Sequence, residues 1–211
     1  MSSKRERCRS WKLYVIADAA AAAGRPLEDV VRAAVRGGAD VIQYRDKAGR
    51  DLDMTETAKR LLAITRPAGV PLIVNDRVAV ARAAAADGVH LGQDDGPIAD
   101  ARAALGEGAI VGRSTHSPEQ ASAADREGAD YIGVGPVFGT PTKPDYVPVG
   151  LDLVRFAAGH VTVPFVAIGG IDASNAATVR RAGARTVAVV RAVSAAADPE
   201  SATRNLLEVL S

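Results

Sequence analysis

Cysteine is almost absent from this sequence, since Cys8 is the only one among 211 residues. A single cysteine excludes an intrachain disulfide and a metal site built on several thiolates. An excess of one charge is also missing, because 26 lysines and arginines stand against 25 acidic residues. A nearly neutral chain is not typical of a dedicated nucleic-acid-binding or membrane-surface protein. We therefore expect neither nucleic acid nor a membrane as a partner.

Long hydrophobic runs are missing as well. The apolar run near the start is short and interrupted by Lys12, so it matches a signal peptide poorly, and no later run could span a membrane. We therefore expect a cytosolic, cytoplasmic protein. The length, with 47% apolar and 24% charged residues, predicts one globular domain over residues 1–211. Residues 1–11 are expected to form a flexible N-terminal extension.

What the chain does have is one unit repeated about eight times. Short runs rich in valine and isoleucine alternate with alanine- and arginine-rich stretches of helical spacing. The runs cover residues 12–18, 39–46, 71–76, 88–93, 109–115, 131–138, 164–170 and 186–192. Nearly continuous apolar runs suit parallel strands buried on both faces. The pattern predicts an α/β fold, a single-domain (β/α)8 TIM barrel, with a doubly wound open sheet as the alternative.

Helix start and stop signals lie where this plan needs them. In the stretch "SPEQASAADREGAD", Ser117 is a candidate N-cap, Pro118 occupies the first helical position and Gly128 follows the helix. His116 precedes this cap, and we interpret it as a cap-adjacent residue. His90 lies inside a strand run and is interpreted as a packed structural histidine.

Polar side chains gather where the predicted strands end, which is the active-site face of a barrel. Gln43, Arg45 and Lys47 alternate along the second run and would face one way while the chain stays extended. A charged surface loop is an equally good interpretation of that segment alone. Asp76 and Asp95 follow neighbouring runs and could share a magnesium ion. Aspartates in such places more often cap helices, so that alternative stays open.

The later strand ends carry groups suited to phosphate. Ser114 and Thr115 offer hydroxyls, and Gly169 and Gly170 leave backbone N–H groups open to close approach before a helix. The stretch "GTPTK" adds Thr140, Thr142 and Lys143 directly after an apolar run. Hydroxyls and a mobile ammonium beside a phosphate site favour a cradle for an anionic ligand over a plain surface loop.

Taken in order, these motifs resemble the thiamine-phosphate synthase family. The motifs are "IQYRDK", "VNDRVAVA", "DGVHLGQDD", "GRSTHS", "GVGPVFGTPTK" and "AIGGI", each at a strand end. The resemblance covers nearly the whole chain apart from about the first ten residues. It implies a transferase of thiamine biosynthesis that joins hydroxymethylpyrimidine pyrophosphate to hydroxyethylthiazole phosphate and releases pyrophosphate. It also implies Mg²⁺ as the cofactor and a dissociative mechanism, which needs no nucleophile or strong base.

The resemblance assigns roles to individual positions. Arg45, Lys47, Asn75 and Lys143 match pyrophosphate contacts, Asp76 and Asp95 match magnesium ligands, Ser114 matches a leaving-group contact, and Gln43 matches the pyrimidine partner. Thr140, Thr142, Gly170, Val190 and Arg191 fall on the thiazole-phosphate side. The positions expected to act directly in catalysis are Arg45, Lys47, Ser114 and Lys143.

Three positions depart from the family pattern. Arg191 stands where the family usually has serine, Arg113 where it has an apolar residue, and Tyr44 where it has leucine. Arg191 could pair with the thiazole phosphate or intrude on its site. Two other functions therefore stay open: a thiazole tautomerase-like paralogue, and a non-catalytic barrel that binds thiamine intermediates. A homo-oligomer is compatible with the sequence.

Overall fold

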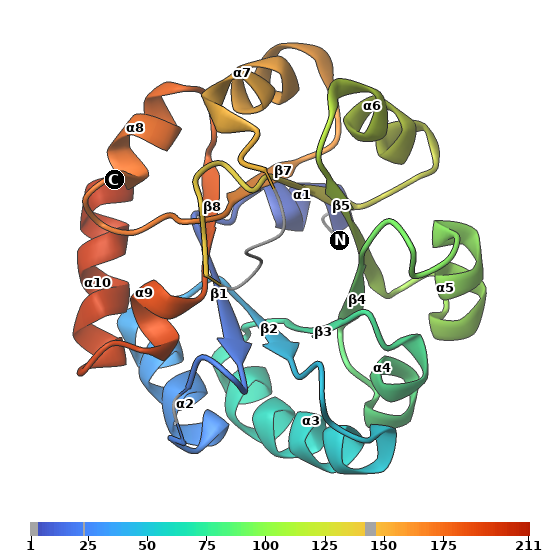
Figure 1. Ribbon diagram of the computed structural model, residues 1–211. Helices are drawn as coiled ribbons and strands as arrows, with labels where there is room; N and C mark the ends of the chain where they lie inside the picture. Colours follow the sequence, from blue (N-terminus) through green and yellow to red (C-terminus); the bar gives the residue numbers. More distant parts are fainter. Residues whose placement is uncertain (1–3, 23, 142–146) are drawn as a thin grey trace.

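The computed structural model describes residues 4–22, 24–141 and 147–211 of the chain. Eight parallel strands close into a barrel in the order β1 to β8, so each strand pairs with its neighbours in sequence and β8 returns to β1. Figure 1 shows the helices as an outer ring around these strands. The strands are β1 (Leu13–Asp18), β2 (Val41–Arg45), β3 (Leu72–Asn75), β4 (Gly88–Leu91), β5 (Ile110–Thr115), β6 (Tyr131–Val134), β7 (Phe165–Ile168) and β8 (Thr186–Val189). The predicted single-domain TIM barrel is confirmed.

Helices after the strands cover the outside of the barrel, whereas α1 precedes β1 and lies at one end of the barrel. They are α1 (Lys4–Arg9), α2 (Leu27–Gly37), α3 (Asp51–Thr65), α4 (Val78–Ala84), α5 (Ile98–Leu105), α6 (Pro118–Arg126), α7 (Gly150–His160), α8 (Ala176–Arg181), α9 (Arg191–Ser194) and α10 (Pro199–Leu210), with a 3-10 turn at Arg66–Ala68. The predicted start of α6 is confirmed, because Ser117 Oγ accepts a hydrogen bond from the Gln120 N–H at 3.3 Å and Pro118 is the first helical residue. In the described part of the chain, no helix is both long and apolar enough to cross a membrane.

Alternation along each strand divides the core into two layers. On β1, Leu13 and Val15 pack outward under the helices, whereas Tyr14 and Ile16 belong to the cluster inside the barrel. Successive strand side chains point to opposite faces, so continuous apolar runs fill both layers at once. The inner cluster is completed by residues from the other strands, and it forms the floor beneath the open end of the barrel.

The N-terminal segment differs from the flexible extension expected for it. Residues Lys4–Arg9 form α1, and the side chains of Cys8 and Trp11 are only 1% and 5% exposed. Trp11 packs edge-on against Tyr14 and Tyr131 inside the barrel, with ring centroids 6.0 and 5.4 Å away. The segment docks because the apolar interior at this end of the barrel needs a cover, and these two side chains supply it.

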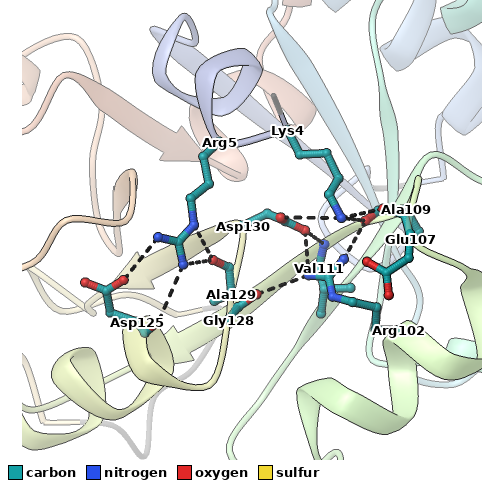
Figure 2. A network of polar contacts seen from close by, with 10 residues as sticks. All are labelled: Lys4, Arg5, Arg102, Glu107, Ala109, Val111, Asp125, Gly128, Ala129 and Asp130. Carbon is teal, nitrogen blue, oxygen red and sulfur yellow. Dashed lines mark hydrogen bonds and ion pairs between the residues drawn. The ribbon is translucent and has the colours of Figure 1, made fainter. Parts of the chain in front are cut away.

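Polar contacts fix α1 to the loops around it (Figure 2). Arg5 donates to the backbone oxygen of Ala129 from Nε at 3.2 Å and from Nη2 at 2.9 Å, and its Nη1 lies 3.4 Å from Asp125 Oδ1. Lys4 Nζ donates to Glu107 O at 2.5 Å and lies 3.7 Å from Asp130 Oδ1. Because these four groups, before β5 and before β6, hold it, α1 is part of the barrel.

Candidate active site

A cavity of about 470 Å³ opens at the carboxyl ends of the strands. Eight of the sequence-predicted site residues line it: Gln43, Arg45, Asn75, Ser114, Thr140, Gly170, Val190 and Arg191. Lys47, Asp76 and Asp95 lie outside the cavity lining and are linked to one another beside it. Thr142 and Lys143 fall outside the described residues. The structure therefore brings most of the predicted positions to one place, which is where barrel enzymes carry their sites.

Strand β2 aims its polar side chains into the barrel as the alternation predicted. Gln43 is 3% exposed, and its Nε2 donates to Tyr14 Oη at 2.8 Å. Arg45, two residues further, forms an ion pair with Asp18 at the end of β1. Tyr44 between them points outward into the layer under the helices. An amide and a guanidinium thus reach the cavity from one strand, each held by a partner.

A chain of side-chain hydrogen bonds crosses the cavity wall from Gln43 to Ser114. The Tyr14 and Tyr131 hydroxyls lie 2.9 Å apart, Tyr131 Oη is 2.9 Å from His90 Nδ1, and His90 Nε2 is 2.9 Å from Ser114 Oγ. Burial raises the pKa of both tyrosines above the ordinary value, so both hydroxyls keep their protons. The two predicted side chains are therefore coupled through three residues that sequence reasoning did not place in the site.

With His90 neutral, one direction of these hydrogen bonds gives both tyrosine hydroxyls an acceptor within the wall. In that direction Tyr14 accepts from Gln43 Nε2, which can only donate, and gives its own hydrogen to Tyr131, which donates to His90 Nδ1. His90 then carries its proton on Nε2 and donates it to Ser114 Oγ. This direction leaves the Ser114 hydroxyl hydrogen for an acceptor in the cavity, such as a phosphate oxygen.

Both histidines near the site have more contacts with it than the sequence indicated. His90 is packed, as expected, but its half-buried ring also lines the cavity. His116 precedes the Ser117 cap, as expected, yet it too lines the cavity, and its Nδ1 lies 2.5 Å from Gly135 O. The signal that could have identified them is their place, because His90 occupies an inward position of β4 and His116 directly follows the end of β5.

Two carboxylates meet beside the cavity. Asp76 adopts a left-handed backbone with φ of 61°, which is uncommon outside glycine and recurs at functional sites. Its backbone N–H donates to His90 O at 2.8 Å, and its carboxylate forms an ion pair with Lys47. The pKa of Asp95 is raised, first by partial burial and then by its hydrogen bond with Asp76. Partial burial and the contact with a second acidic group both disfavour the charged form of Asp95 and so raise its pKa.

The carboxylate pair fits a divalent cation that has further ligands of its own. Among the described residues, no group of three or more histidine, cysteine or acidic side chains could hold a metal alone. Magnesium is bound by one or two carboxylates together with water and substrate phosphate oxygens. Asp76 and Asp95 would supply the protein's share of such a set, and a cation between them would relieve the repulsion of two charged carboxylates.

Glycines shape the opposite side of the cavity, after β7. Gly169 and Gly170 have φ of 107° and 61°. A Cβ on Gly169 would lie 2.5 Å from Pro136 Cα, and one on Gly170 would lie 2.6 Å from Gly139 O. Both positions therefore need glycine, and the close packing brings the loop after β7 against the loop after β6. Arg191 lines the same cavity from the end of β8, with an exposed side chain.

The chain is similar to thiamine-phosphate synthases over most of its length. The family pattern described as thiamine monophosphate synthase matches residues 13–193. A thiamine-phosphate synthase of Chloroflexus aurantiacus is 53% identical over 95% of this chain and 93% of the relative. One of Natronomonas pharaonis is 48% identical over 94% of each.

Solved structures agree with these relatives. A thiamine phosphate pyrophosphorylase from Pyrococcus furiosus superposes with a TM-score of 0.88 and 40% identity, covering 96% of each chain. A (S)-3-O-geranylgeranylglyceryl phosphate synthase from Thermoplasma acidophilum gives a TM-score of 0.74 at 17% identity over 100% of this chain and 99% of that one, which shows the shared barrel fold alone.

Proposed function

Because this chain belongs to the thiamine monophosphate synthase family, we propose that it joins hydroxymethylpyrimidine pyrophosphate to hydroxyethylthiazole phosphate. The products are thiamine phosphate and pyrophosphate. The chain is an enzyme, a transferase of thiamine biosynthesis, like its relatives. The choice of substrates, the role of magnesium, the mechanism and a cytoplasmic location are parts of this proposal.

One observation carries the proposal: a single cavity has a hydrogen-bonded polar wall and a glycine-lined side, and a lysine and two carboxylates lie beside it. Gln43 offers an amide for hydrogen bonds to a nitrogen heterocycle. Arg45 and Asn75 line the cavity next to Lys47 and the two carboxylates. Gly170, Thr140 and the end of β8 face this set across the cavity. Two phosphorylated heterocycles have room to meet between the two sides.

We propose that the reaction is dissociative. The bond between the pyrimidine methylene carbon and the pyrophosphate oxygen breaks, and its electron pair leaves with pyrophosphate. The thiazole nitrogen then donates its lone pair to the methylene cation and forms the new carbon–nitrogen bond. No proton has to be removed, and the hydrogen-bond donors and cations in and beside the cavity support such a step. Charge placed where charge develops is the main source of such catalysis.

In this proposal each residue acts on one part of that step. Arg45, Lys47, Asn75 and Ser114 donate to the departing pyrophosphate, together with Lys143 from the segment outside the described residues. Mg²⁺ held by Asp76 and Asp95 would offset the negative charge that grows on the leaving group. Gly170, Val190 and Arg191, with Thr140 and Thr142, hold the thiazole phosphate.

Product formation by the purified chain tests the proposal. Both phosphorylated heterocycles are supplied with Mg²⁺ or with EDTA, and thiamine phosphate and pyrophosphate are quantified. We expect equal amounts of both products with Mg²⁺ and a loss of at least 100-fold with EDTA, which corresponds to about 2.7 kcal/mol of activation free energy. Isomerisation of the thiazole without coupling would identify a tautomerase, and binding without turnover a non-catalytic barrel.

Paired aspartate variants test the carboxylate site. Asp95→Asn removes one proposed ligand. Asp94→Asn makes the same substitution at the neighbouring, exposed aspartate, which is not a proposed ligand. We expect Asp95→Asn to lose most turnover and Asp94→Asn to stay close to wild type. Equal activity of the two variants would contradict the assignment of Asp95.

A further inference from the structure

Arg113 is a buried cation that lies behind the site. It sits on β5, next to Ser114, and its side chain is only 6% exposed. Nη1 donates to Gly92 O at 2.5 Å and Nη2 donates to Gly96 O at 2.6 Å. Among the ion pairs of the described residues none involves Arg113, so backbone oxygens take the place of a carboxylate. A buried charge persists only where such partners compensate its lost hydration.

The two bonds span the loop that carries Asp95. Gly92 and Gly96 are the two ends of the turn between β4 and α5, and one planar guanidinium contacts both. Gln93 adds a third link to β5, because its Nε2 donates to Ser114 O at 2.5 Å. Within the turn, Asp95 Oδ2 accepts the Gly92 N–H at 2.7 Å. The turn is therefore held to β5 at both ends, and the Asp95 carboxylate points back to the first residue of the turn.

The geometry of these two contacts suits arginine. Its guanidinium is a rigid fork with donors on two separate nitrogens, whereas lysine presents one point charge and leucine presents no donor. Without Arg113, the carbonyl oxygens of Gly92 and Gly96 lose buried partners, and Gly96, with φ of 89°, sits at a point where the chain turns easily. The position of Asp95 relative to Asp76 would then be less well defined.

We propose that Arg113 is a positioning residue that preorganises the cation site by holding the 92–96 turn so that Asp95 faces Asp76. It touches neither substrate nor cation in this role. The part that concerns the cation rests on the proposed function, whereas the effect on the turn does not. A side chain that fixes a ligand-bearing loop lowers the conformational cost of binding.

The test compares Arg113→Leu and Arg113→Lys with a matched control, Arg102→Leu. Arg102 also donates to backbone oxygens, those of Ala109 at 3.2 Å and Gly128 at 3.1 Å, and it pairs with Asp130 (Figure 2). These partners lie before the starts of β5 and β6, whereas the 92–96 turn follows the end of β4. Amide hydrogen exchange of residues 92–96 reports the turn. Mn²⁺ titrations with inorganic pyrophosphate, followed by electron paramagnetic resonance, report the cation site without turnover.

We expect both Arg113 variants to exchange the amides of residues 92–96 at least tenfold faster than wild type and to bind Mn²⁺ about tenfold more weakly. In turnover the same variants should need about tenfold more Mg²⁺ for half-maximal rate, with the KM for thiazole phosphate unchanged. Arg102→Leu should lower the unfolding midpoint without either shift.

The proposal would be overturned if the amides of residues 92–96 exchanged at the same rate in Arg113→Leu as in wild type. Equal Mn²⁺ affinities in Arg113→Leu and wild type would also overturn it. Equal shifts in Arg102→Leu would reduce the effect to general destabilisation and would also overturn it. If wild type forms no thiamine phosphate but the exchange and Mn²⁺ results are as expected, the proposed reaction fails while the role of Arg113 holds.

Discussion

Tyr14 is the side chain that fixes the direction of the Gln43 amide. Its hydroxyl accepts from Gln43 Nε2 and lies 2.9 Å from the Tyr131 hydroxyl, so it connects the amide to the rest of the hydrogen-bonded wall. With Nε2 committed to Tyr14, the amide oxygen of Gln43 is left to accept from a ligand. A heterocycle with an amino group would find an oriented acceptor rather than a rotating amide.

Deletion of the Tyr14 hydroxyl should therefore weaken recognition of the pyrimidine. Tyr14→Phe leaves Gln43 Nε2 and Tyr131 without a shared partner in a buried wall, and an amide without a fixed partner can turn over. We expect kcat/KM for the pyrimidine pyrophosphate to fall about tenfold, equivalent to about 1.4 kcal/mol, with a smaller effect on the KM for thiazole phosphate. Steady-state kinetics with each substrate varied in turn measures this.

Tyr44→Phe is the matched control. Tyr44 is also a buried tyrosine whose pKa is raised to about 12 by burial, but it faces the helices, with its hydroxyl bonded to Thr57. The Tyr44→Phe variant should lose about as much free energy of unfolding as Tyr14→Phe does, and its kcat/KM should match that of wild type. If Tyr44→Phe reduces kcat/KM as much as Tyr14→Phe does, the hydroxyl of Tyr14 has no particular role in recognition.

For single residues, the sequence indicated the two ends of the hydrogen-bonded wall but not the three side chains between them. Gln43 and Ser114 were predictable because a polar residue at the end of an apolar run is unusual. Tyr14, Tyr131 and His90 lie within the runs, where aromatic residues suit a strand core, and both tyrosines are indeed buried. Nothing in a single strand indicates that three such residues from β1, β4 and β6 share hydrogen bonds. That depends on the closure of the barrel.

At the scale of elements, the loops after β6 and β7 act as one unit because glycine lets them touch. Gly170→Ala would add a Cβ that lies 2.6 Å from Gly139 O and 2.8 Å from Phe138 Cβ. The loop after β6 has to move away, and it carries Thr140 on the cavity wall. We expect this variant to raise the KM for thiazole phosphate at least tenfold and to lose about 1–2 kcal/mol of stability because of its positive φ.

Gly69→Ala separates strain from contact. Gly69 has φ of 70° in the left-handed region, so alanine is strained there as well, but nothing lies within 4 Å of the added Cβ. The control should lose stability by a similar amount and keep its KM. Unfolding in urea and steady-state kinetics on both variants measure the two effects, and an unchanged KM in Gly170→Ala would refute the contact between the loops as a determinant of the site.

The docking of α1 can be measured through the reactivity of its cysteine. Cys8 faces the barrel from α1, and burial raises its pKa from 9.0 to about 12. At pH 8 roughly one thiol in 10⁴ is then ionised, against about one in ten for an ordinary thiol of pKa 9, and the thiolate is the reactive form. We predict very slow reaction of the native protein with Ellman's reagent, and rapid reaction in urea.

Arg5→Ala should accelerate that labelling, because Arg5 holds α1 to Ala129 and Asp125. A loss of about 1–2 kcal/mol in docking corresponds to about a 5- to 30-fold faster rate when labelling requires α1 to open. Arg32→Ala removes an exposed arginine that pairs only locally with Asp29 on α2 and serves as control. Equal rates in the two variants would show that the contacts of Arg5 do not limit opening.

Elements with a repeated pattern were predictable, and α1 was not. All eight strands lie within the runs read from the sequence, because a strand buried on both faces leaves a continuous apolar signal. Residues 4–10 have only Cys8 as a buried position, in a stretch of charged residues that looks like solvent-exposed chain. Whether this segment covers the end of the barrel depends on the shape of the inner cluster that it packs against, and no local sequence pattern indicates that shape. The end of β8 also differs, since Arg191 begins α9 instead of extending the strand.

For the molecule as a whole, the inner cluster couples the closed end of the barrel to the cavity. Cys8 and Trp11 lie under Tyr14 and Tyr131, whose hydroxyls belong to the cavity wall. Three ionisable side chains, the cysteine and the two tyrosines, are therefore buried in one apolar column. Burial disfavours the charged form of each, and all three have a raised pKa.

This column should make the barrel sensitive to alkali. A group whose pKa is higher in the folded state keeps its proton there while the unfolded chain releases it, so stability falls as pH rises above the unfolded pKa. The ordinary values are 9.0 for cysteine and 10.0 for tyrosine, so the loss should begin near pH 9 with Cys8 and steepen near pH 10. Each group adds about 1.4 kcal/mol per pH unit once it is ionised only in the unfolded chain.

Urea unfolding between pH 7.5 and 10.5 measures this slope, and Cys8→Ala identifies its first component. The alanine variant loses packing and should be less stable at every pH, but it has no thiol to ionise in the unfolded chain. Its free energy of unfolding should therefore fall less steeply than that of wild type between pH 9 and 10, by up to about 1.4 kcal/mol per unit. Parallel curves would mean that the folded barrel lets Cys8 ionise, and hence that α1 does not seal this end against solvent.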